Sequence, residues 1–241
     1  FLNIDQFGGL GEVSDRLYQR NEGGWSDLFE AAANTGVINQ FSGRSVACLD
    51  RDGDGRYGVF VANYGGPMKL FEMTDAGALR DVGESAGIAL TTGGRALLAL
   101  PVGDGPMDMF AGNENGANFL FQNQGDGTFE ERAATFGITD ASQTVRGATT
   151  LDADGDGDFD LVYGNWRGPH RLWLRDGDAF TLATPSEMES PSKIRTVIAA
   201  DFDNDGYEEI FWNNIGEPNR LFKQTPDGWE SIDMGDALEP D

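Results

Sequence analysis

The sequence predicts an all-β protein, a β-propeller built from four-stranded blades. Three observations support this fold class: an internal repeat of about 50 residues, short apolar runs within each repeat, and glycine-rich turns between the runs. A four-stranded sheet cannot bury both of its faces alone, whereas radial stacking of neighbouring sheets buries them. A β-solenoid is the alternative, but its coils are usually shorter than these repeats.

Three unrelated markers define the repeat. A leucine followed by an aromatic residue recurs at Leu17-Tyr18, Leu70-Phe71, Leu120-Phe121, Leu172-Trp173 and Leu221-Phe222. An asparagine lies upstream at Asn63, Asn113, Asn165 and Asn213, with Asn3 as a fifth candidate. An arginine opens each unit, at Arg44, Arg95, Arg146 and Arg195. Because all three share one period, chance is a poor explanation for the pattern.

The unit that starts at Arg44 has the order expected of a blade. A short apolar run ends in an acidic loop, and two further strand-like segments at 57–64 and 68–73 follow. A closing segment at 79–88 completes the unit. Related closing segments at 28–37 and 129–138 contain alanines, which are compatible with a short helical turn in place of a strand.

The repeats predict one propeller segment over 1–241, with about 4¾ blades. The units are 1–43, a partial blade in which residues 1–4 occupy the place of a second strand, and 44–94, 95–145, 146–194 and 195–241. Because a propeller must close its ring, the chain is either a window of a longer propeller or lacks a strand that comes from elsewhere. The window is favoured because Phe1 begins in the middle of a blade. A start at phenylalanine in place of methionine indicates a processed or trimmed chain.

The composition limits the partners. Lys plus Arg number 17 and Asp plus Glu number 41, which gives a formal net charge of −24. Such a charge argues against nucleic acid and anionic membranes as partners and favours cations or basic proteins. No apolar run approaches the ~18 residues of a membrane span, so membrane insertion is not expected. Cys48 has no second thiol and apolar neighbours, which predict a buried structural thiol.

Acidic loops follow the arginines at a fixed distance. Asp152, Asp154, Asp156 and Asp160 occupy the first, third, fifth and ninth positions of one loop; Asp201, Asp203, Asp205 and Glu209 occupy those of another. A third loop contains Asp50, Asp52 and Asp54, but Gly58 stands at its ninth position. The loop after Arg95 has lost the pattern and keeps only Asp104 and Asp108 nearby.

This spacing points to calcium, a hard cation that takes six to eight oxygen ligands. Glycine at the sixth position allows the turn, and the seventh residue, Asp158 or Tyr207, can offer its backbone carbonyl. The side chains of Asp158 and Glu208 are then spare acids that face solvent. Two calcium sites are predicted at the complete loops and a third at the Asp50 loop.

Other readings of the loops are weaker. An EF-hand would need a glutamate at the twelfth position and flanking helices, but Tyr163 and Trp212 stand there and the flanks are strand-like. Magnesium prefers fewer protein ligands, and zinc would need histidine or cysteine. A solvated acidic turn without an ion is the remaining alternative, above all for the Asp50 loop.

These loops resemble the FG-GAP or VCBS repeats of integrin α subunits, and longer segments are similar to the cartilage acidic protein family. The similar segments read FSGRSVACLDRDGDGRYGVFVANY (41–64), NENGANFLFQNQGDGTF (113–129), VYGNWRGPHRL (162–172), IRTVIAADFDNDG (194–206) and GDALEP (235–240). The resemblance implies a secreted, calcium-binding, seven-bladed propeller that acts by binding other proteins in the extracellular matrix or at the cell surface. In bacteria the implied location is periplasmic or on the cell surface.

Three functions remain open. The first is a calcium-stabilised protein-binding or adhesion module, whose partners include other proteins or the remaining blades of the same propeller. The second is a carbohydrate-binding propeller that uses Trp25, Trp166 and Trp229 as exposed platforms, with Trp173 and Trp212 in the core. The third is a polysaccharide-active enzyme, which is disfavoured because no catalytic cluster is evident.

Two features have a functional and a structural reading. His170 lies in a turn and has no neighbouring nucleophile, so an ordinary turn histidine is expected. The four repeated arginines either form a cationic ring that recruits an anionic ligand or each pair with a carboxylate of the adjacent blade.

Overall fold

The computed structural model of the chain describes residues 2, 10–103, 105–226 and 228–234. Antiparallel strands joined by short turns dominate these residues, and the helical elements are single turns. The all-β prediction is therefore confirmed. The strand expected at residues 1–4, the candidate Asn3, Asp104 and the segment 235–240 lie outside the described residues.

The chain divides into two compact units. The first contains residues 1–99, 105–111 and 120–132, and the second contains residues 100–104, 112–119 and 133–241. Each unit is described by itself, and the number of blades stays a prediction.

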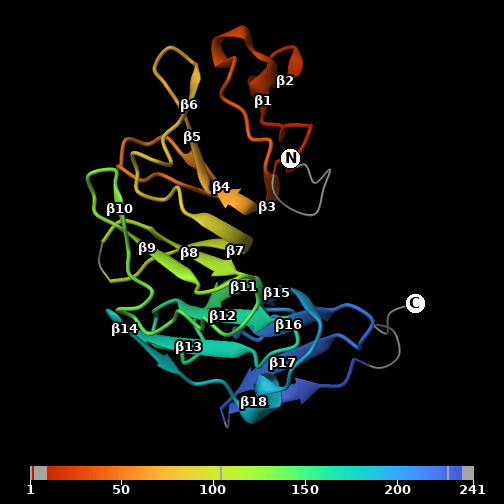
Figure 1. The fold of residues 1–241 in the computed structure, drawn as a ribbon. Helices are drawn as coiled ribbons and strands as arrows, with labels where there is room; N and C mark the ends of the chain where they lie inside the picture. The colour runs from red at the N-terminus through yellow and green to blue at the C-terminus, as the bar shows by residue number, and fades with distance from the viewer. Residues whose placement is uncertain (1, 3–9, 104, 227, 235–241) are drawn as a thin grey trace. The chain divides into compact units, whose positions relative to one another are not determined.

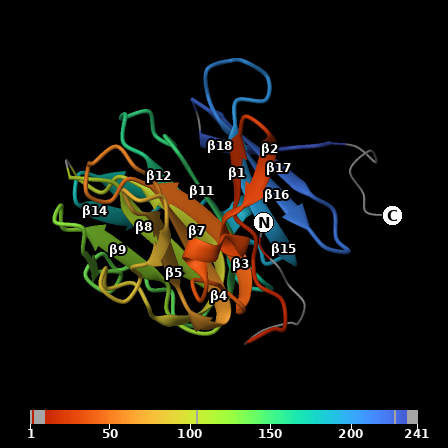
Figure 2. The same ribbon diagram turned by 90° about the horizontal axis from the view of Figure 1, so that it is seen from above.

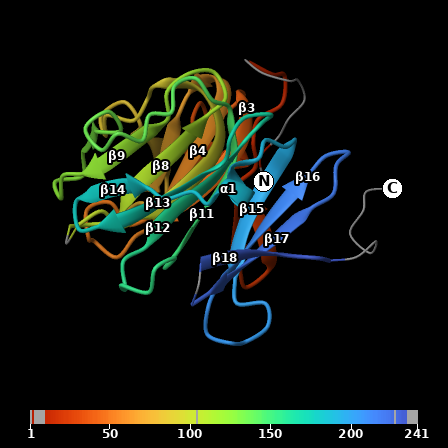
Figure 3. The same cartoon turned by 90° about the horizontal axis from the view of Figure 1, so that it is seen from below.

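Two four-stranded antiparallel sheets make up most of the second unit. One has the order β11 (Val145–Leu151), β12 (Asp160–Asn165), β13 (Arg171–Asp176) and β14 (Ala179–Leu182); the other has the order β15 (Ile194–Ala200), β16 (Glu209–Asn214), β17 (Arg220–Thr225) and β18 (Gly228–Ile232). The helical turn α1 (Ser186–Glu189) lies between them in sequence. In each sheet, strands that follow one another in sequence are neighbours (Figure 3), as the sequence predicts for a propeller blade.

The core of the second unit lies between these two sheets. It contains Leu151, Val162 and Leu172 from one sheet, Val197, Ile210, Trp212 and Phe222 from the other, and Met188 of α1. β11 lies beside β15 (Figure 1), and a Cβ at Gly147 would come within 2.7 Å of the Thr196 Cα. Glycine therefore permits a backbone approach that a larger residue would block.

Eight strands form one continuous sheet, assigned mainly to the first unit. They are β3 (Ser42–Leu49), β4 (Gly58–Pro67), β5 (Lys69–Met73), β6 (Leu79–Asp81), β7 (Thr91–Leu100), β8 (Asp108–Asn113), β9 (Phe119–Asn123) and β10 (Phe129–Glu131). The order is β10-β9-β8-β7-β4-β5-β6, and β3 also pairs with β4. Figure 2 shows β3, β4, β5, β7, β8 and β9 of this sheet from above. The sequence predicts separate sheets here. They join because the end of β4 extends past its blade and pairs with the start of β7, from Tyr64↔Gly93 to Pro67↔Thr91.

The beginning of the described chain forms a small hairpin, β1 (Tyr18–Asn21) with β2 (Gly24–Asp27). Two 3₁₀ turns follow, η1 (Leu28–Glu30) and η2 (Ala32–Asn34), where the sequence allows a short helical turn in the closing segment 28–37. Phe29 of η1 packs edge-on against Phe71 at 5.1 Å between ring centroids and belongs to the core of the first unit with Val61 and Leu79.

The repeated asparagine closes the turn after the second strand of each blade. Its Nδ2 donates to the carbonyl four residues later: Asn63 to Pro67 at 2.7 Å, Asn113 to Ala117 at 3.0 Å, Asn165 to Pro169 at 2.6 Å and Asn214 to Pro218 at 2.7 Å. In the last blade the sequence singles out Asn213, and the structure assigns this role to its neighbour. The prediction is wrong by one residue because both positions hold asparagine.

The single cysteine lies on the surface. Cys48 is exposed on β3, on the same face as Val46, whose side chain is also exposed, while Leu49 turns into the core. The prediction of a buried thiol is therefore wrong. Side chains alternate between the two faces of a strand, so an apolar run does not reveal which face is covered. Among the described residues, no helix is both long and apolar enough to cross a membrane.

Candidate metal centre

Three acidic loops each gather carboxylates around a small volume. Asp50, Asp52 and Asp54 form one group, Asp152, Asp154 and Asp160 the second, and Asp201, Asp203 and Glu209 the third. Within each group, one oxygen from each residue lies within 4.8 Å of the others. Such convergence of like charges is unfavourable unless a cation, hydrogen bonds or both neutralise it.

The first aspartate of each loop organises the turn. Asp152 accepts hydrogen bonds from the backbone N–H groups of Gly155 and Gly157, at 2.8 and 3.1 Å. Asp50 accepts from Gly53 and Gly55 in the same way, and Asp201 from Asp205 and Gly206. The sixth residue has positive φ in all three loops, +85° to +95°, and glycine adopts that conformation without strain.

The ninth residue ties the start of the second strand to the loop. Asp160 Oδ2 accepts the N–H of Ala153 at 2.6 Å, and its Oδ1 accepts the N–H of Arg175 at 2.7 Å. Glu209 Oε2 accepts the N–H of Phe202 at 2.8 Å. Both acids are buried, whereas the loop positions before them are largely exposed.

Burial raises the pKa of Asp160 to about 6, and the charges of Asp154 and Asp156 act in the same direction. The two backbone N–H groups that it accepts oppose this shift. Glu208, which the sequence places in solvent, is half-buried. Burial raises the pKa of this carboxyl, the backbone hydrogen bond of Asp152 opposes the shift, and the charges of Asp152 and Asp201 add to it. The acids thus lie where an additional positive charge would be favourable.

The remaining predicted loop residues are placed differently. Asp156 and Asp205, at the fifth position, accept backbone N–H groups two residues later and fall outside the convergent groups. Asp158 is no spare surface acid, because it forms an ion pair at 2.7 Å with Arg175, whose side chain is 95% buried. The Tyr207 side chain is half-exposed, and its predicted carbonyl ligand role stays a prediction.

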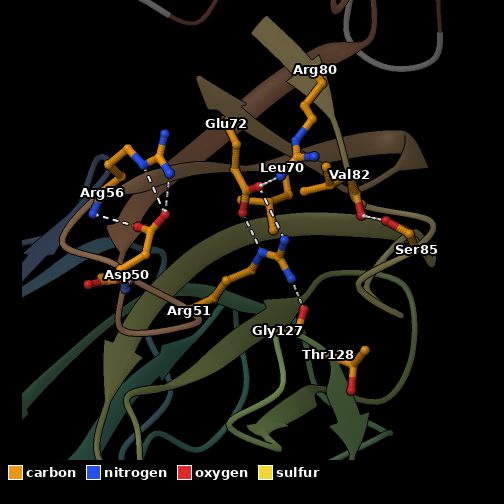
Figure 4. A network of polar contacts seen from close by, with 12 residues as sticks. Asp50, Arg51, Arg56, Leu70, Glu72, Arg80, Val82, Ser85, Gly127 and Thr128 are labelled. Carbon is orange, nitrogen blue, oxygen red and sulfur yellow. Dashed lines mark hydrogen bonds and ion pairs between the residues drawn. The ribbon is translucent and has the colours of Figure 1, made fainter. Parts of the chain in front are cut away.

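The Asp50 loop is held by arginines. Arg56 bonds to Asp54 and to Asp75 of the next turn. Arg51 forms an ion pair with Glu72 of β5 and donates to the carbonyl of Gly127 (Figure 4). These guanidinium groups supply part of the positive charge in the loop that lacks an acid at its ninth position.

The sequence analysis missed the basic residues that contact the loops from neighbouring strands. Lys223 of β17 bonds to Asp203 and Asp205, and Arg175 of β13 bonds to Asp158. The repeat could have identified them, because Lys223 lies one position and Arg175 two positions after the leucine–aromatic pair of its own unit.

The second residue of two loops contacts the following blade. Asn123 Nδ2 donates to the carbonyl of Arg51 at 2.9 Å, and Gln224 Nε2 donates to the carbonyl of Ala153 at 2.6 Å. Asn123 and Gln224 stand at equivalent repeat positions, two residues beyond the aromatic of the leucine–aromatic pair. The acidic loops are therefore linked to the packing of one blade on the next.

Three of the four repeated arginines, Arg44, Arg95 and Arg146, lie over aromatic rings. Arg44 and Arg95 both lie over Tyr64, at 5.5 and 5.3 Å from the ring centroid. Arg146 lies 4.0 Å over Trp166 and forms an ion pair with Glu114 of the preceding unit. Pairing with an adjacent blade is thus confirmed for Arg146, and the aromatic partners were not predicted.

The exposure of the tryptophan side chains differs in part from the prediction. Trp25 is 68% exposed, as predicted, and Trp212 is buried. Trp166 is half-buried beneath two arginines, and Trp229 packs against the core of the second unit. His170 is buried in the turn between β12 and β13, accepting the N–H of Asn165, which fits the structural reading.

Comparison with known proteins agrees with the repeats. A family model described as FG-GAP-like repeat matches residues 102–163 and 152–212. Cartilage acidic protein 1 of Xenopus tropicalis is 43% identical and that of Homo sapiens 42%, in both cases over the whole chain. The chain belongs to the cartilage acidic protein family. It spans 42% of the length of the first of these family members and 41% of the second.

A solved structure supports the fold. The Aleuria aurantia lectin, in a complex with Fucalpha1-6GlcNAc, aligns over 92% of this chain and 71% of its own, with a TM-score of 0.50 and 13% identity. At that identity, the likeness supports the fold of this chain and says nothing of its function.

Proposed function

We propose that the chain is a calcium-binding propeller module that acts outside the cytosol by binding other proteins, with calcium in a structural role. The observation that carries this proposal is the convergence of three carboxylates in each of three repeated loops. Asp152, Asp154 and Asp160 would hold one ion, and Asp201, Asp203 and Glu209 a second. The group of Asp50, Asp52 and Asp54 would form the third and least complete site.

The donor chemistry fits calcium. The convergent side chains offer carboxylate oxygens only, which a hard cation prefers. Glu209 adds a specific sign, because its side chain is 97% buried and its Oε1 accepts no hydrogen bond. A buried carboxylate oxygen without a hydrogen bond is costly unless a cation satisfies it. Bound calcium would supply positive charge that neutralises the clustered acids.

An extracellular location is proposed because weak calcium sites fill only where the calcium concentration is high. With a dissociation constant near 10⁻⁴ M, calcium at ~1 mM would stabilise the fold by roughly 1.4 kcal/mol per site. Millimolar calcium is an extracellular condition. The family name and the strongly acidic composition agree with a matrix or cell-surface module whose partners are proteins.

Calcium binding is tested by titration calorimetry together with thermal unfolding. We expect at least two bound ions and a clear fall in melting temperature when calcium is removed by a chelator. Replacing Asp154 and Asp203 together by asparagine should abolish most of this calcium-dependent shift, because each residue supplies one ligand oxygen of a convergent group. Both residues are exposed, so the substitutions should leave the fold intact.

Glu187→Gln is the matched control, since it removes an exposed negative charge on α1 away from the loops. It should bind as many ions as the unchanged chain. If the melting temperature changes neither when calcium is added nor when a chelator removes it, the metal has no structural role.

Saccharide binding is the second candidate, and the 68% exposed Trp25 favours it. Aromatic rings of this kind stack on sugar rings. If the chain is a lectin, glycan-array binding should disappear in Trp25→Ala and persist in Trp166→Ala, because Trp166 is already covered by Arg146 and Arg167. If no glycan is retained by the unchanged chain, this candidate fails and protein binding is the better proposal.

A further inference from the structure

The strand next to each acidic loop places one side chain opposite the ninth loop position. The register pairs Phe71 with Val59, Trp173 with Leu161 and Phe222 with Ile210. One residue further along, Glu72, Leu174 and Lys223 stand opposite Gly58, Asp160 and Glu209. Directly opposed residues in an antiparallel pair direct their side chains to the same face. The same structural position is therefore acidic, apolar and basic in the three loops.

Lys223 uses this position to contact the 201–209 loop. Its Nζ bonds to Asp203, lies 2.6 Å from Asp205 Oδ2 and lies 3.9 Å from Glu209 Oε1. A lysine ammonium carries a positive charge at neutral pH. One ammonium group thus faces the third, fifth and ninth positions of the loop.

The ammonium does not satisfy the loop completely. Glu209 Oε1 is buried, belongs to the convergent group and accepts no hydrogen bond, since 3.9 Å is too long for one. The oxygen is therefore available as a ligand for a cation.

The 152–160 loop differs at this point. Leu174 replaces the lysine, and the nearest basic side chain, Arg175, bonds to Asp158 at the seventh position and to the carbonyls of Phe159 and Gly177. In the described part of the chain, no ion pair reaches Asp152, Asp154 or Asp160. Calcium would enter this loop without displacing a charged side chain.

We propose that Lys223 is a built-in competitor of calcium at the 201–209 loop, so that this loop fills at higher calcium concentration than the 152–160 loop. The inference rests on the proposed function, that both loops bind calcium. Binding at the 201–209 loop must break the contacts of the ammonium with Asp203 and Asp205 and then keep a positive charge close to the divalent ion. The two loops thereby respond to different calcium concentrations.

The test compares calcium binding to the 241-residue chain with binding to Lys223→Leu, which copies the residue found beside the 152–160 loop. Titration calorimetry should resolve a weaker and a stronger class of site in the unchanged chain. In Lys223→Leu the 201–209 loop should gain affinity by on the order of ten-fold, whereas the affinities of the other loops should stay unchanged. Terbium luminescence excited through Tyr207, which lies in the loop itself, should report the same gain at that site.

Two further variants make the result specific. Lys223→Gln keeps the length and polarity of the side chain without its charge, and it should show a similar gain. Lys193→Leu removes a lysine that pairs with Glu217 away from the loops, and its calcium affinities should match those of the unchanged chain.

The outcomes separate the two proposals. If calcium binds equally well with and without the Lys223 charge, the competitor role is wrong and the calcium sites stand. If neither the unchanged chain nor any variant takes up calcium or terbium, both proposals are wrong.

Discussion

Replacing Trp212 by alanine is expected to lower the free energy of unfolding by about 3–5 kcal/mol, because it removes a large side chain from the centre of a packed core. Trp212 is 1% exposed; its ring lies 4.4 Å from the His170 ring and 6.3 Å from that of Phe222, centroid to centroid. Urea unfolding followed by circular dichroism measures the change. Trp25→Ala is the control, because this side chain is 68% exposed and its loss should change stability by less than about 0.5 kcal/mol.

Trp212→Phe refines this prediction. The indole Nε1 of Trp212 is buried without a hydrogen bond, so phenylalanine keeps much of the apolar contact and removes an unsatisfied donor. Its cost should be clearly smaller than that of alanine. Equal losses for Trp212→Ala and Trp25→Ala would mean that the two sheets of the second unit do not pack around this residue.

The repeat could be predicted because each of its elements depends on residues that are close together in the sequence. Alternating apolar residues define strands, and the asparagine and glycine turns punctuate them. The acidic loops could be predicted for the same reason, since the ligand candidates and the enabling glycine lie within nine consecutive residues. The structure accordingly gathers the first, third and ninth residues of both complete loops.

The sequence could not predict the contacts between side chains that lie on different strands or in different repeats. Tyr64 is placed between Arg44 and Arg95 by the folding of two repeats, and Lys223 meets Asp203 only through the pairing of β16 with β17. Exposure of Cys48 has the same origin, because the covering of a strand face depends on distant segments. A local sequence pattern predicts where strands and turns lie, whereas these contacts depend on how the strands pair.

His170 provides a second large and testable effect, a loss of stability in acid. Its Nδ1 accepts the N–H of Asn165 at 3.0 Å, so the proton of the neutral ring is on Nε2, which donates to Ser192 Oγ at 2.9 Å. The Ser192 hydroxyl donates in turn to Asn214 Oδ1 at 2.7 Å. The histidine thus joins the two sheets of the second unit, and protonation of Nδ1 would break the first of these bonds.

The environment of His170 opposes protonation. Burial lowers the pKa of His170 from 6.5 to about 3, and the positive charges of Arg220 and Arg171 add to this effect. Because the unfolded chain binds the proton at higher pH than the folded chain, the contribution is complete above pH 6.5 and is lost as the pH falls toward 3. Between pH 7.5 and pH 4.5 the loss should be roughly 2–3 kcal/mol.

The substitution His170→Asn should remove this loss while keeping the turn. In two other blades the equivalent residues are Asn118 and Asn219, whose Oδ1 atoms accept the same backbone N–H at 3.0 and 2.8 Å. Urea unfolding of both proteins from pH 4.5 to 7.5 gives the difference in their stability. Asp160, whose carboxyl has a raised pKa, works in the opposite direction, but it is present in both proteins and cancels in that difference. Since the chain has one histidine, parallel curves for the two proteins would show that the ring is not held neutral in the fold.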